Sequence, residues 1–168
     1  METIQKKSYR LVFLDIDGVL NCKSTVDKVG PYRGIEDEKV ALLKKLVLAT
    51  KSKLILVSSW KEHWYRQQEQ KSQQDELANY LDEKLLKYGL KITAKVSDYE
   101  CLGRGHSINK YINYIKEKGI DIASFIILDD HSHDYKESGL LENLVKTNFN
   151  SNGLTQKHIN KALLLLKQ

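Results

Sequence analysis

Seven polar side chains follow three apolar runs of the chain: Asp15 and Asp17, Ser58 and Ser59, and Asp129, Asp130 and Asp134. Positions i and i+2 of an extended segment point the same way, so we expect the carboxylates of Asp15 and Asp17 to face one crevice. Buried carboxylates are costly unless a partner neutralises them. Their types and positions therefore suggest a site for chemistry rather than ordinary packing.

Carboxylates that gather at one place repel one another and cannot all stay ionised without a cation. A hard divalent ion with oxygen ligands meets that need, and Mg²⁺ takes a few carboxylates while keeping several waters. One aspartate after one strand would be an ordinary loop residue. Acids after two separate apolar runs, with hydroxyls after a third, instead favour a Mg²⁺ site.

The elements that must position these side chains are strands alternating with helices. Apolar runs predict strands at 9–14, 53–57, 92–96, 124–128 and 144–146, and helical spacing predicts helices at 35–50, 106–118 and 155–166. Residues 21–34 are expected to form a loop, and the polar, Gln-rich residues 61–88 predict one long exposed helix or two shorter ones. Thr155 is the expected N-cap of the last helix.

The predicted strands are apolar throughout, which is typical of a parallel sheet covered on both faces. We therefore predict an α/β fold, a three-layer α/β/α Rossmann-like domain with a central, mostly parallel sheet. No repeat or linker is visible, so residues 1–168 are expected to form a single domain. In such folds the active site lies at the carboxyl ends of the strands, where the polar side chains are placed.

The composition is that of an ordinary globular chain. Of 168 residues, 41% are hydrophobic and 29% are charged, with a formal net charge of +5. The basic excess is spread along the chain, so it suits an anionic substrate but forms no nucleic-acid stripe. We see neither a membrane span nor a signal peptide. Cys22 and Cys101 lack metal-type spacing and are interpreted as free thiols, which favours a cytoplasmic protein; we expect a monomer or weak dimer.

Four motifs in order resemble the haloacid dehalogenase (HAD) superfamily. The first motif of that family, DxDGx(V/T), stands here as DIDGV at 15–19. The second is a Ser or Thr after an apolar strand, here Ser58 in LILVSSW. The third is a Lys, or less often an Arg, near the start of a helix, and Arg104 in GRGHSI matches best. The fourth is an acidic pair, here Asp129 and Asp130 in ILDD.

The resemblance implies a role for each of these residues. Asp15 would be the nucleophile that forms an aspartyl-phosphate, and Asp17 would protonate the leaving group and then activate water. Ser58, with Ser59 beside it, would bind a phosphoryl oxygen. Arg104 would balance the charge of the aspartyl-phosphate. Gly18 would allow the tight turn after the first strand, next to the phosphate. Two further residues, Lys95 and Lys110, are weaker matches for the basic position.

The resemblance also implies a Mg²⁺ ion. Its ligands would be Asp15, the backbone carbonyl of Asp17, and either Asp129 or Asp130. The ion would let an anionic carboxylate approach an anionic phosphate.

An acid at position 17 resembles the phosphatases and phosphomutases of the superfamily, whereas its ion-pumping ATPases have Thr there. We therefore predict a Mg²⁺-dependent phosphatase that hydrolyses phosphate monoesters. A phosphotransferase or phosphomutase on the same scaffold, and a non-catalytic phosphate-binding module, are the alternatives. The intervals between motifs are too short for a cap domain. The chain thus resembles the capless members of the superfamily, which resemble enzymes that act on macromolecules. Nucleic-acid ends and phosphoproteins, including those with phosphotyrosine, are therefore the expected substrates.

The motif details resemble the HAD-like domains of the Swiss army knife RNA-repair group, including a VKT…GLT tail at 145–155. That likeness favours nucleic-acid ends as substrates, with phosphoproteins still open.

Weaker features have two interpretations each. Trp60 and Trp64 lie four residues apart, which predicts one helix face that either packs on the sheet or stacks a substrate ring. His131 and His133 form an H-x-H pair that either binds metal or lines the pocket. Asp134 is a candidate outer-shell acid near the metal.

Overall fold

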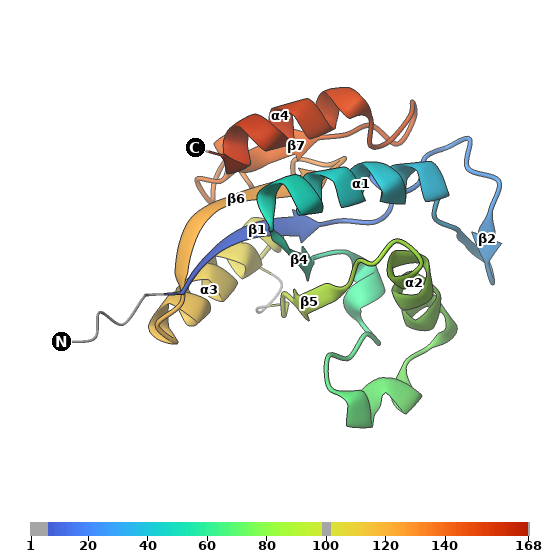
Figure 1. The fold of residues 1–168 in the computed structure, drawn as a ribbon, viewed down its shortest axis with the longest axis horizontal. Helices are drawn as coiled ribbons and strands as arrows, with labels where there is room; N and C mark the ends of the chain where they lie inside the picture. Colours follow the sequence, from blue (N-terminus) through green and yellow to red (C-terminus); the bar gives the residue numbers. More distant parts are fainter. Residues whose placement is uncertain (1–6, 99–101, 168) are drawn as a thin grey trace.

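A five-stranded sheet forms the centre of the protein in a computed structural model, which describes residues 7–98 and 102–167 (Figure 1). Its strands follow the spatial order β5 (Ile92–Lys95), β4 (Lys53–Leu56), β1 (Ser8–Leu14), β6 (Asp121–Asp129) and β7 (Leu144–Lys146). Every neighbouring pair is parallel. All carboxyl ends therefore lie at one edge of the sheet, and the central strands β1 and β6 end where the acids begin.

The continuous apolar strands bury both faces of the sheet. In β1, Val12 and Leu14 belong to one hydrophobic core, while Leu11 and Phe13 belong to the core on the opposite face. Side chains of successive strand residues point to opposite faces, so only a run without polar residues can fill both cores. This packing confirms the predicted three-layer arrangement.

Helices cover the two faces unequally. The core on one face includes residues of α1 (Asp37–Thr50), α2 (Glu76–Leu86) and α4 (Gln156–Leu166). On the opposite face α3 (Arg104–Glu117) is the one α-helix among the described residues (Figure 1). Thr155 caps α4 as predicted, and its backbone N–H donates to Nδ1 of His158 at 3.1 Å.

The helix prediction for residues 61–88 is correct only for its second half. The segment before α2 forms two short 3₁₀ turns, Ser59–Lys61 and Gln68–Gln73, with irregular chain between them. Asp75 fixes the start of α2, because its carboxylate accepts a hydrogen bond from the N–H of Ala78 at 2.8 Å. Trp60 and Trp64 therefore do not share a helix face, although both are buried, as packing requires.

The predicted loop at 21–34 contains a small hairpin, β2 (Lys28–Val29) and β3 (Tyr32–Arg33). Gly30, with φ +54°, and Pro31 form its two-residue turn. Between β1 and β4 the described chain holds only this hairpin and α1, which agrees with the absence of a cap domain.

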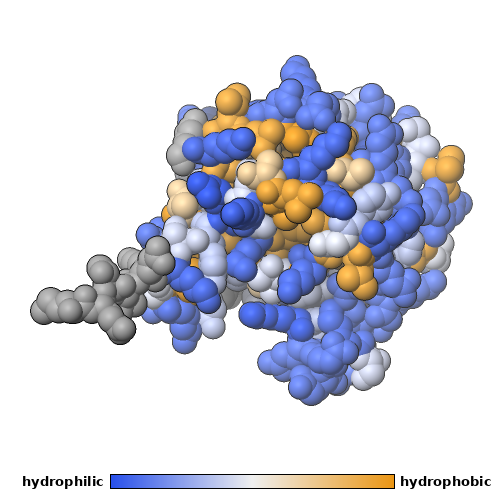
Figure 2. Space-filling view, in the orientation of Figure 1, coloured by the Kyte–Doolittle hydropathy of each residue, from blue (hydrophilic) through white to orange (hydrophobic). Residues whose placement is uncertain are grey.

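The surface is mostly hydrophilic on the face seen in Figure 2, with separate hydrophobic patches over α1 and α4. Leu48 on α1 and Leu164 on α4 are among the exposed apolar residues. Within the described ranges, no helix has the length and apolar character needed to cross a membrane. Cys22 is a buried free cysteine, and Cys101 lies outside the described residues.

Candidate active site

A cavity of about 380 Å³ opens at the carboxyl end of the sheet. Nine residues line it: Asp15, Asp17, Ser59, Arg104, Asp130, His131, Asn148, Phe149 and Asn150. Asp15 and Asp17 thus share one cavity, as their spacing predicted. Part of the wall comes from Asn148, Phe149 and Asn150 in the segment after β7, which was not expected at the site from the sequence.

Three carboxylates converge beside this cavity. Asp15 follows β1, Asp129 is the last residue of β6, and Asp130 follows it; each offers an oxygen, and these oxygens all lie within 4.8 Å of one another. Such a set of oxygen donors is what a hard divalent cation takes from a protein. The residues therefore fit the divalent ion that the motifs suggested. The side chain of Asp17 is not part of this group, so its expected contribution through the backbone carbonyl stays a prediction.

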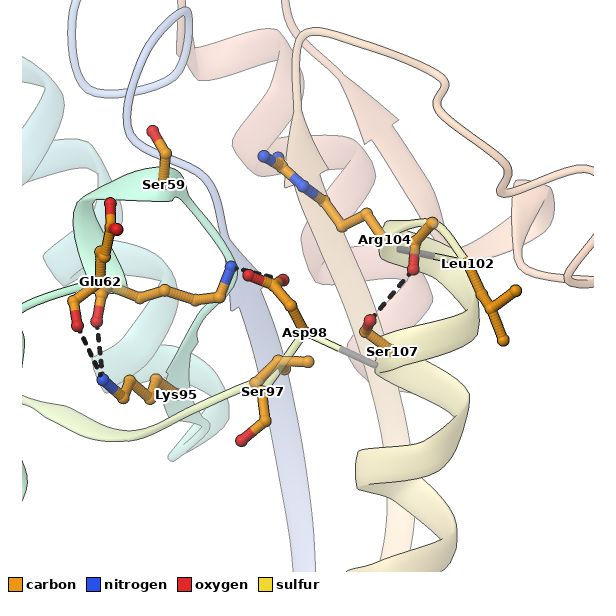
Figure 3. A pocket seen from close by; sticks show the side chains of 11 residues that line it. Ser59, Glu62, Lys95, Ser97, Asp98, Leu102, Arg104 and Ser107 are labelled. Carbon is orange, nitrogen blue, oxygen red and sulfur yellow. Dashed lines mark hydrogen bonds and ion pairs between the residues drawn. The ribbon is translucent and has the colours of Figure 1, made fainter. Parts of the chain in front are cut away.

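Arg104 is the cation of the site, and it is the first residue of α3. Its Nη1 atom lies 2.6 Å from Oδ2 of Asp129 and 3.3 Å from Oδ2 of Asp15. Figure 3 shows the side chain extending from the start of α3 toward the end of β1. The other matches for the basic position lie elsewhere: Nζ of Lys95 donates to backbone carbonyls of the 3₁₀ turn after β4, and Lys110 is exposed.

Asp134 fixes the helix end from which Arg104 extends. Its carboxylate accepts hydrogen bonds from the N–H groups of Gly105 at 2.7 Å and His106 at 3.0 Å, at the amino end of α3. Gly103 makes this approach possible: its φ is +108°, and a Cβ there would lie 2.5 Å from Cγ of Asp134. Asp134 thus positions α3 and lies outside the group of converging carboxylates. Its role as an outer-shell acid near a metal stays a prediction.

Asp129 is fully buried, and both of its oxygens are hydrogen-bonded. Oδ2 accepts from Arg104 and, at 2.7 Å, from the hydroxyl of Tyr135, while Oδ1 accepts from the N–H of His131 at 2.8 Å. Nε2 of His133 lies 3.4 Å from Oδ2. This environment leaves Asp129 little freedom to move.

Asp130 faces the cavity instead. Its Oδ2 lies 3.6 Å from Nε2 of His131, whose side chain is largely exposed. The approach of Asp130 depends on Gly18, which has φ +79°; a Cβ at that position would lie 2.3 Å from Cγ of Asp130. A glycine is therefore needed at position 18 for two reasons: the turn has a positive φ, and a Cβ would occupy the space of the Asp130 carboxylate. His131 lines the cavity, which agrees with the second interpretation of the H-x-H pair, and the converging group contains no histidine.

Burial and charge set the pKa values of the three acids apart. Burial is the largest effect on Asp15 and raises its pKa to about 6; Asp129 adds to the rise, and Arg104 and the Ser58 hydroxyl oppose it. Burial likewise raises the pKa of Asp130. Burial also disfavours the charge on Asp129, but His133, Arg104 and Tyr135 outweigh it and lower its pKa. The site thus carries an excess of negative charge that one arginine does not balance.

Asp17 is held by two neutral donors. Nε1 of Trp60 donates to Oδ2 of Asp17 at 3.0 Å, and Nδ2 of Asn21 donates to Oδ1 at 2.8 Å. Oδ1 of Asn21 in turn accepts from the N–H of Gly18. Neither Trp60 nor Asn21 was assigned this function from the sequence. Their contacts fix the Asp17 carboxylate without a permanent countercharge, which is compatible with the acid–base role that the resemblance predicts for Asp17.

The two serines after β4 are placed differently. Ser58 is buried and does not line the cavity; its hydroxyl interacts with Asp15 and accepts a hydrogen bond from the N–H of Trp60 at 3.3 Å. Ser59 is exposed and lines the cavity itself. Phosphoryl binding by either hydroxyl stays a prediction, and Ser59 is the one already at the cavity surface.

Tyr135 and Phe149 are further site residues that could not be selected from the sequence. Tyr135 is a fully buried tyrosine, and its contact with Asp129 depends on the path of the chain after β6. Phe149 lines the cavity while the guanidinium of Arg33 lies 5.6 Å from its ring centre. No local pattern marks either residue.

The parallel sheet with helices on both faces, the acids after β1 and β6 and the arginine at the start of α3 define a HAD-like domain. Residues 11–159 match the family model described as the HAD domain in Swiss Army Knife RNA repair proteins, and the chain belongs to that family. A search of curated proteins found no match. Family and acid cluster together suggest phosphatase-like activity of the HAD type and a site that could bind a divalent metal.

Proposed function

We propose that the protein hydrolyses phosphate monoesters through an aspartyl-phosphate intermediate on Asp15. The observation that carries this proposal is the convergence of Asp15, Asp129 and Asp130 around Arg104, with Asp17 on the same cavity. With a pKa of about 6, Asp15 is mainly ionised above neutral pH and available as a nucleophile.

In the first step, a carboxylate oxygen of Asp15 attacks the substrate phosphorus. The bond between phosphorus and the ester oxygen breaks, and that oxygen takes a proton from Asp17. Trp60 and Asn21 keep the Asp17 carboxyl directed at the cavity during this transfer. In the second step, the Asp17 carboxylate removes a proton from water, the water oxygen attacks the same phosphorus, and the bond to Asp15 breaks to release inorganic phosphate.

Three groups would balance charge during these steps. A divalent ion, which we take to be Mg²⁺, would be held by Asp15, Asp130 and the backbone carbonyl of Asp17, and would supply charge neutralisation at the phosphoryl group. Asp130 is preferred over Asp129 as the ligand because it faces the cavity. Arg104 supplies a fixed positive charge beside Asp15. Ser59 supplies a hydroxyl for a phosphoryl oxygen.

The test is turnover of p-nitrophenyl phosphate by the purified protein with Mg²⁺ and with a chelator. Asp15→Asn is expected to lower kcat by on the order of 10⁴-fold or more, as removal of a nucleophile does. A hydroxylamine-sensitive phosphoenzyme should form with wild type alone. Asp27→Asn, which removes an exposed acid outside the cavity, is the matched control and should keep full activity. Equal turnover by wild type and Asp15→Asn would contradict the proposal.

We further propose that the substrate is macromolecular, because no cap domain closes over the cavity among the described residues. A panel of 3′- and 5′-phosphorylated oligonucleotides, phosphopeptides and nucleotides would identify the class. A macromolecular substrate should show a higher kcat/KM than any nucleotide of the panel; a preference for free nucleotides would overturn this part.

A further inference from the structure

The sheet face covered by α3 has an open groove beside that helix. The groove has a volume of about 540 Å³ and is lined by residues of β1, β4, β5 and α3 and by the irregular segment before α2. Leu11 and Ile55, both buried, are among its lining residues. We call this hollow the tyrosine groove, because four of its lining residues are Tyr9, Tyr65, Tyr111 and Tyr114.

Positive charge accompanies these rings. The described lining contains four cations and no acidic residue; the cations are Lys53, Arg66, Lys95 and Lys118. Three of them lie over tyrosine rings, at these distances from ammonium nitrogen to ring centre: Lys53 over Tyr9 at 4.6 Å, Lys95 over Tyr65 at 5.2 Å and Lys118 over Tyr114 at 5.5 Å. Flat rings and cations therefore stand next to one another along the groove, whereas the catalytic cavity is lined by acids.

A third hollow lies between the tyrosine groove and the catalytic cavity. A cavity of about 690 Å³ shares Lys95 with the groove, and it shares Ser59 and Arg104 with the catalytic cavity (Figure 3). Its own wall includes Asp98, which is paired with Nζ of Lys61 at 2.9 Å, and the exposed Glu62. The three hollows therefore adjoin one another in series, with Lys95 bordering the first two and Ser59 and Arg104 bordering the last two.

We propose that the tyrosine groove binds a single-stranded segment of nucleic acid whose phosphorylated end occupies the catalytic cavity. Aromatic faces beside cations match a chain of flat bases linked by phosphates, since bases stack on the rings and phosphates contact the cations. Stacking of this kind needs unpaired bases, which excludes a duplex. The placement of the phosphorylated end rests on the proposed function, but strand binding in the groove does not.

Strand binding can be measured without catalysis. The probe is a fluorescein-labelled single-stranded RNA of about ten nucleotides without a terminal phosphate, followed by fluorescence anisotropy in the presence of a chelator. The double variant Arg66→Glu/Lys118→Glu reverses two exposed charges of the groove and should weaken binding at least tenfold. For this variant the binding constant should also fall less steeply with increasing salt concentration, because fewer counterions are released on binding. The matched control, Lys45→Glu/Lys157→Glu, makes the same charge change at exposed residues of α1 and α4 and should bind more tightly than the groove variant.

The ring contribution has its own variant. Tyr114 is 53% exposed, so Tyr114→Ala should leave the fold intact, with an unchanged melting curve, and weaken binding of the strand by about fivefold or more. A single-stranded DNA of the same sequence shares the stacking and phosphate chemistry and is the second arm, which separates an RNA site from a general single-strand site. Equal losses in groove and control variants, or tighter binding of a duplex or of an acidic peptide of equal charge, would overturn the inference.

These outcomes separate the two proposals. Hydrolysis of p-nitrophenyl phosphate should be unchanged in Arg66→Glu/Lys118→Glu, because neither residue lines the catalytic cavity. Oligonucleotide binding by a protein that fails to hydrolyse any phosphomonoester would refute the proposed function and retain the groove. Hydrolysis without groove-dependent binding would refute the groove and retain the function.

Discussion

Two clusters of charged side chains in this molecule use the same residue types in opposite ways. The site cluster is Asp15, Asp129, Asp130 and Arg104, with three acids and one base gathered at the end of the sheet. The surface cluster is Asp27, Asp37, Lys84 and Lys87, with two acids and two bases between α1, α2 and the β2–β3 hairpin. The first is buried and has excess negative charge, and the second is largely exposed and balanced.

The pKa values follow this difference. In the surface cluster, hydrogen bonds from Lys87 and Lys84 lower the pKa of Asp37, and those from Tyr80 and Lys84 lower the pKa of Asp27. In the site cluster, burial raises the pKa of Asp15 and Asp130. An aspartate therefore stabilises the fold where charge is balanced, and costs stability where it is buried with an excess of negative charge.

The largest expected effect is removal of the one base in the site cluster. Arg104→Met should lower the free energy of unfolding of the metal-free protein by about 3 kcal/mol, because it leaves the buried carboxylates of Asp15 and Asp129 without their permanent countercharge. Urea unfolding at pH 7.5 with a chelator measures this. Arg104→Lys, which keeps the charge, should lose less. A loss smaller than that of Lys84→Met would contradict the contrast between the clusters.

Addition of a cation should have the next largest effect. Mg²⁺ at 100 times its Kd should stabilise the protein by about 2.7 kcal/mol, which raises the melting temperature by about 5–10 °C for a chain of this size. Asp130→Asn should abolish most of this shift, while Asp27→Asn in the surface cluster should leave it intact. Equal shifts in the two variants would show that the ion does not bind at the site cluster.

Much of this arrangement could be predicted from the sequence, because strand burial and backbone direction are local properties. A run such as 11–14 has no polar face, so it must be a central strand, and the acid after it must lie at the sheet edge. The same logic correctly placed Asp15, Asp17, Asp129 and Asp130 at one edge, with Arg104 at the start of a helix. Motif spacing is sufficient to predict the positions of residues that stand directly at the ends of strands and helices.

The rest depends on side-chain contacts between distant segments. Trp60 reaches Asp17 only because the chain after β4 turns in a 3₁₀ helix, where the Gln-rich sequence had suggested a longer one. The tyrosine groove draws its cations from four separate segments, so no stripe of positive charge is visible in the linear sequence. The modest net charge of +5 therefore does not reveal the local concentration of cations in the tyrosine groove, which exists only in the folded chain.

The dependence of stability on pH should show directly how much the ionised, buried carboxylate of Asp15 destabilises the fold. Its pKa is 3.8 when unfolded and about 6 when folded, so between these values the folded protein holds a proton that the unfolded chain has lost. The stability of the metal-free protein therefore falls as pH rises through this window. Asp15→Asn lacks this cost and should be more stable than wild type by about 1–3 kcal/mol above pH 6. Below pH 4 the difference should vanish; a constant difference across the range would exclude Asp15 as its source.

The smallest expected effect is the loss of the base shared by both acids of the surface cluster. Nζ of Lys84 lies 3.0 Å from Oδ1 of Asp37 and 3.2 Å from Oδ2 of Asp27, but these carboxylates are 40% and 50% exposed. Solvent and salt screen such pairs, so Lys84→Met should cost no more than about 1 kcal/mol in low salt and less in 1 M NaCl.

The pH dependence of this loss should be opposite to that of Asp15. Because the pKa values of Asp27 and Asp37 are lowered by folding, their stabilisation is complete above the unfolded pKa of 3.8 and disappears as pH falls through the folded values. Wild type and Lys84→Met should therefore converge in stability at low pH and separate above pH 4. Opposite dependences of stability on pH are what balanced and unbalanced carboxylates require. A surface cluster whose stabilisation fell with rising pH would therefore contradict the contrast in charge balance between the two clusters.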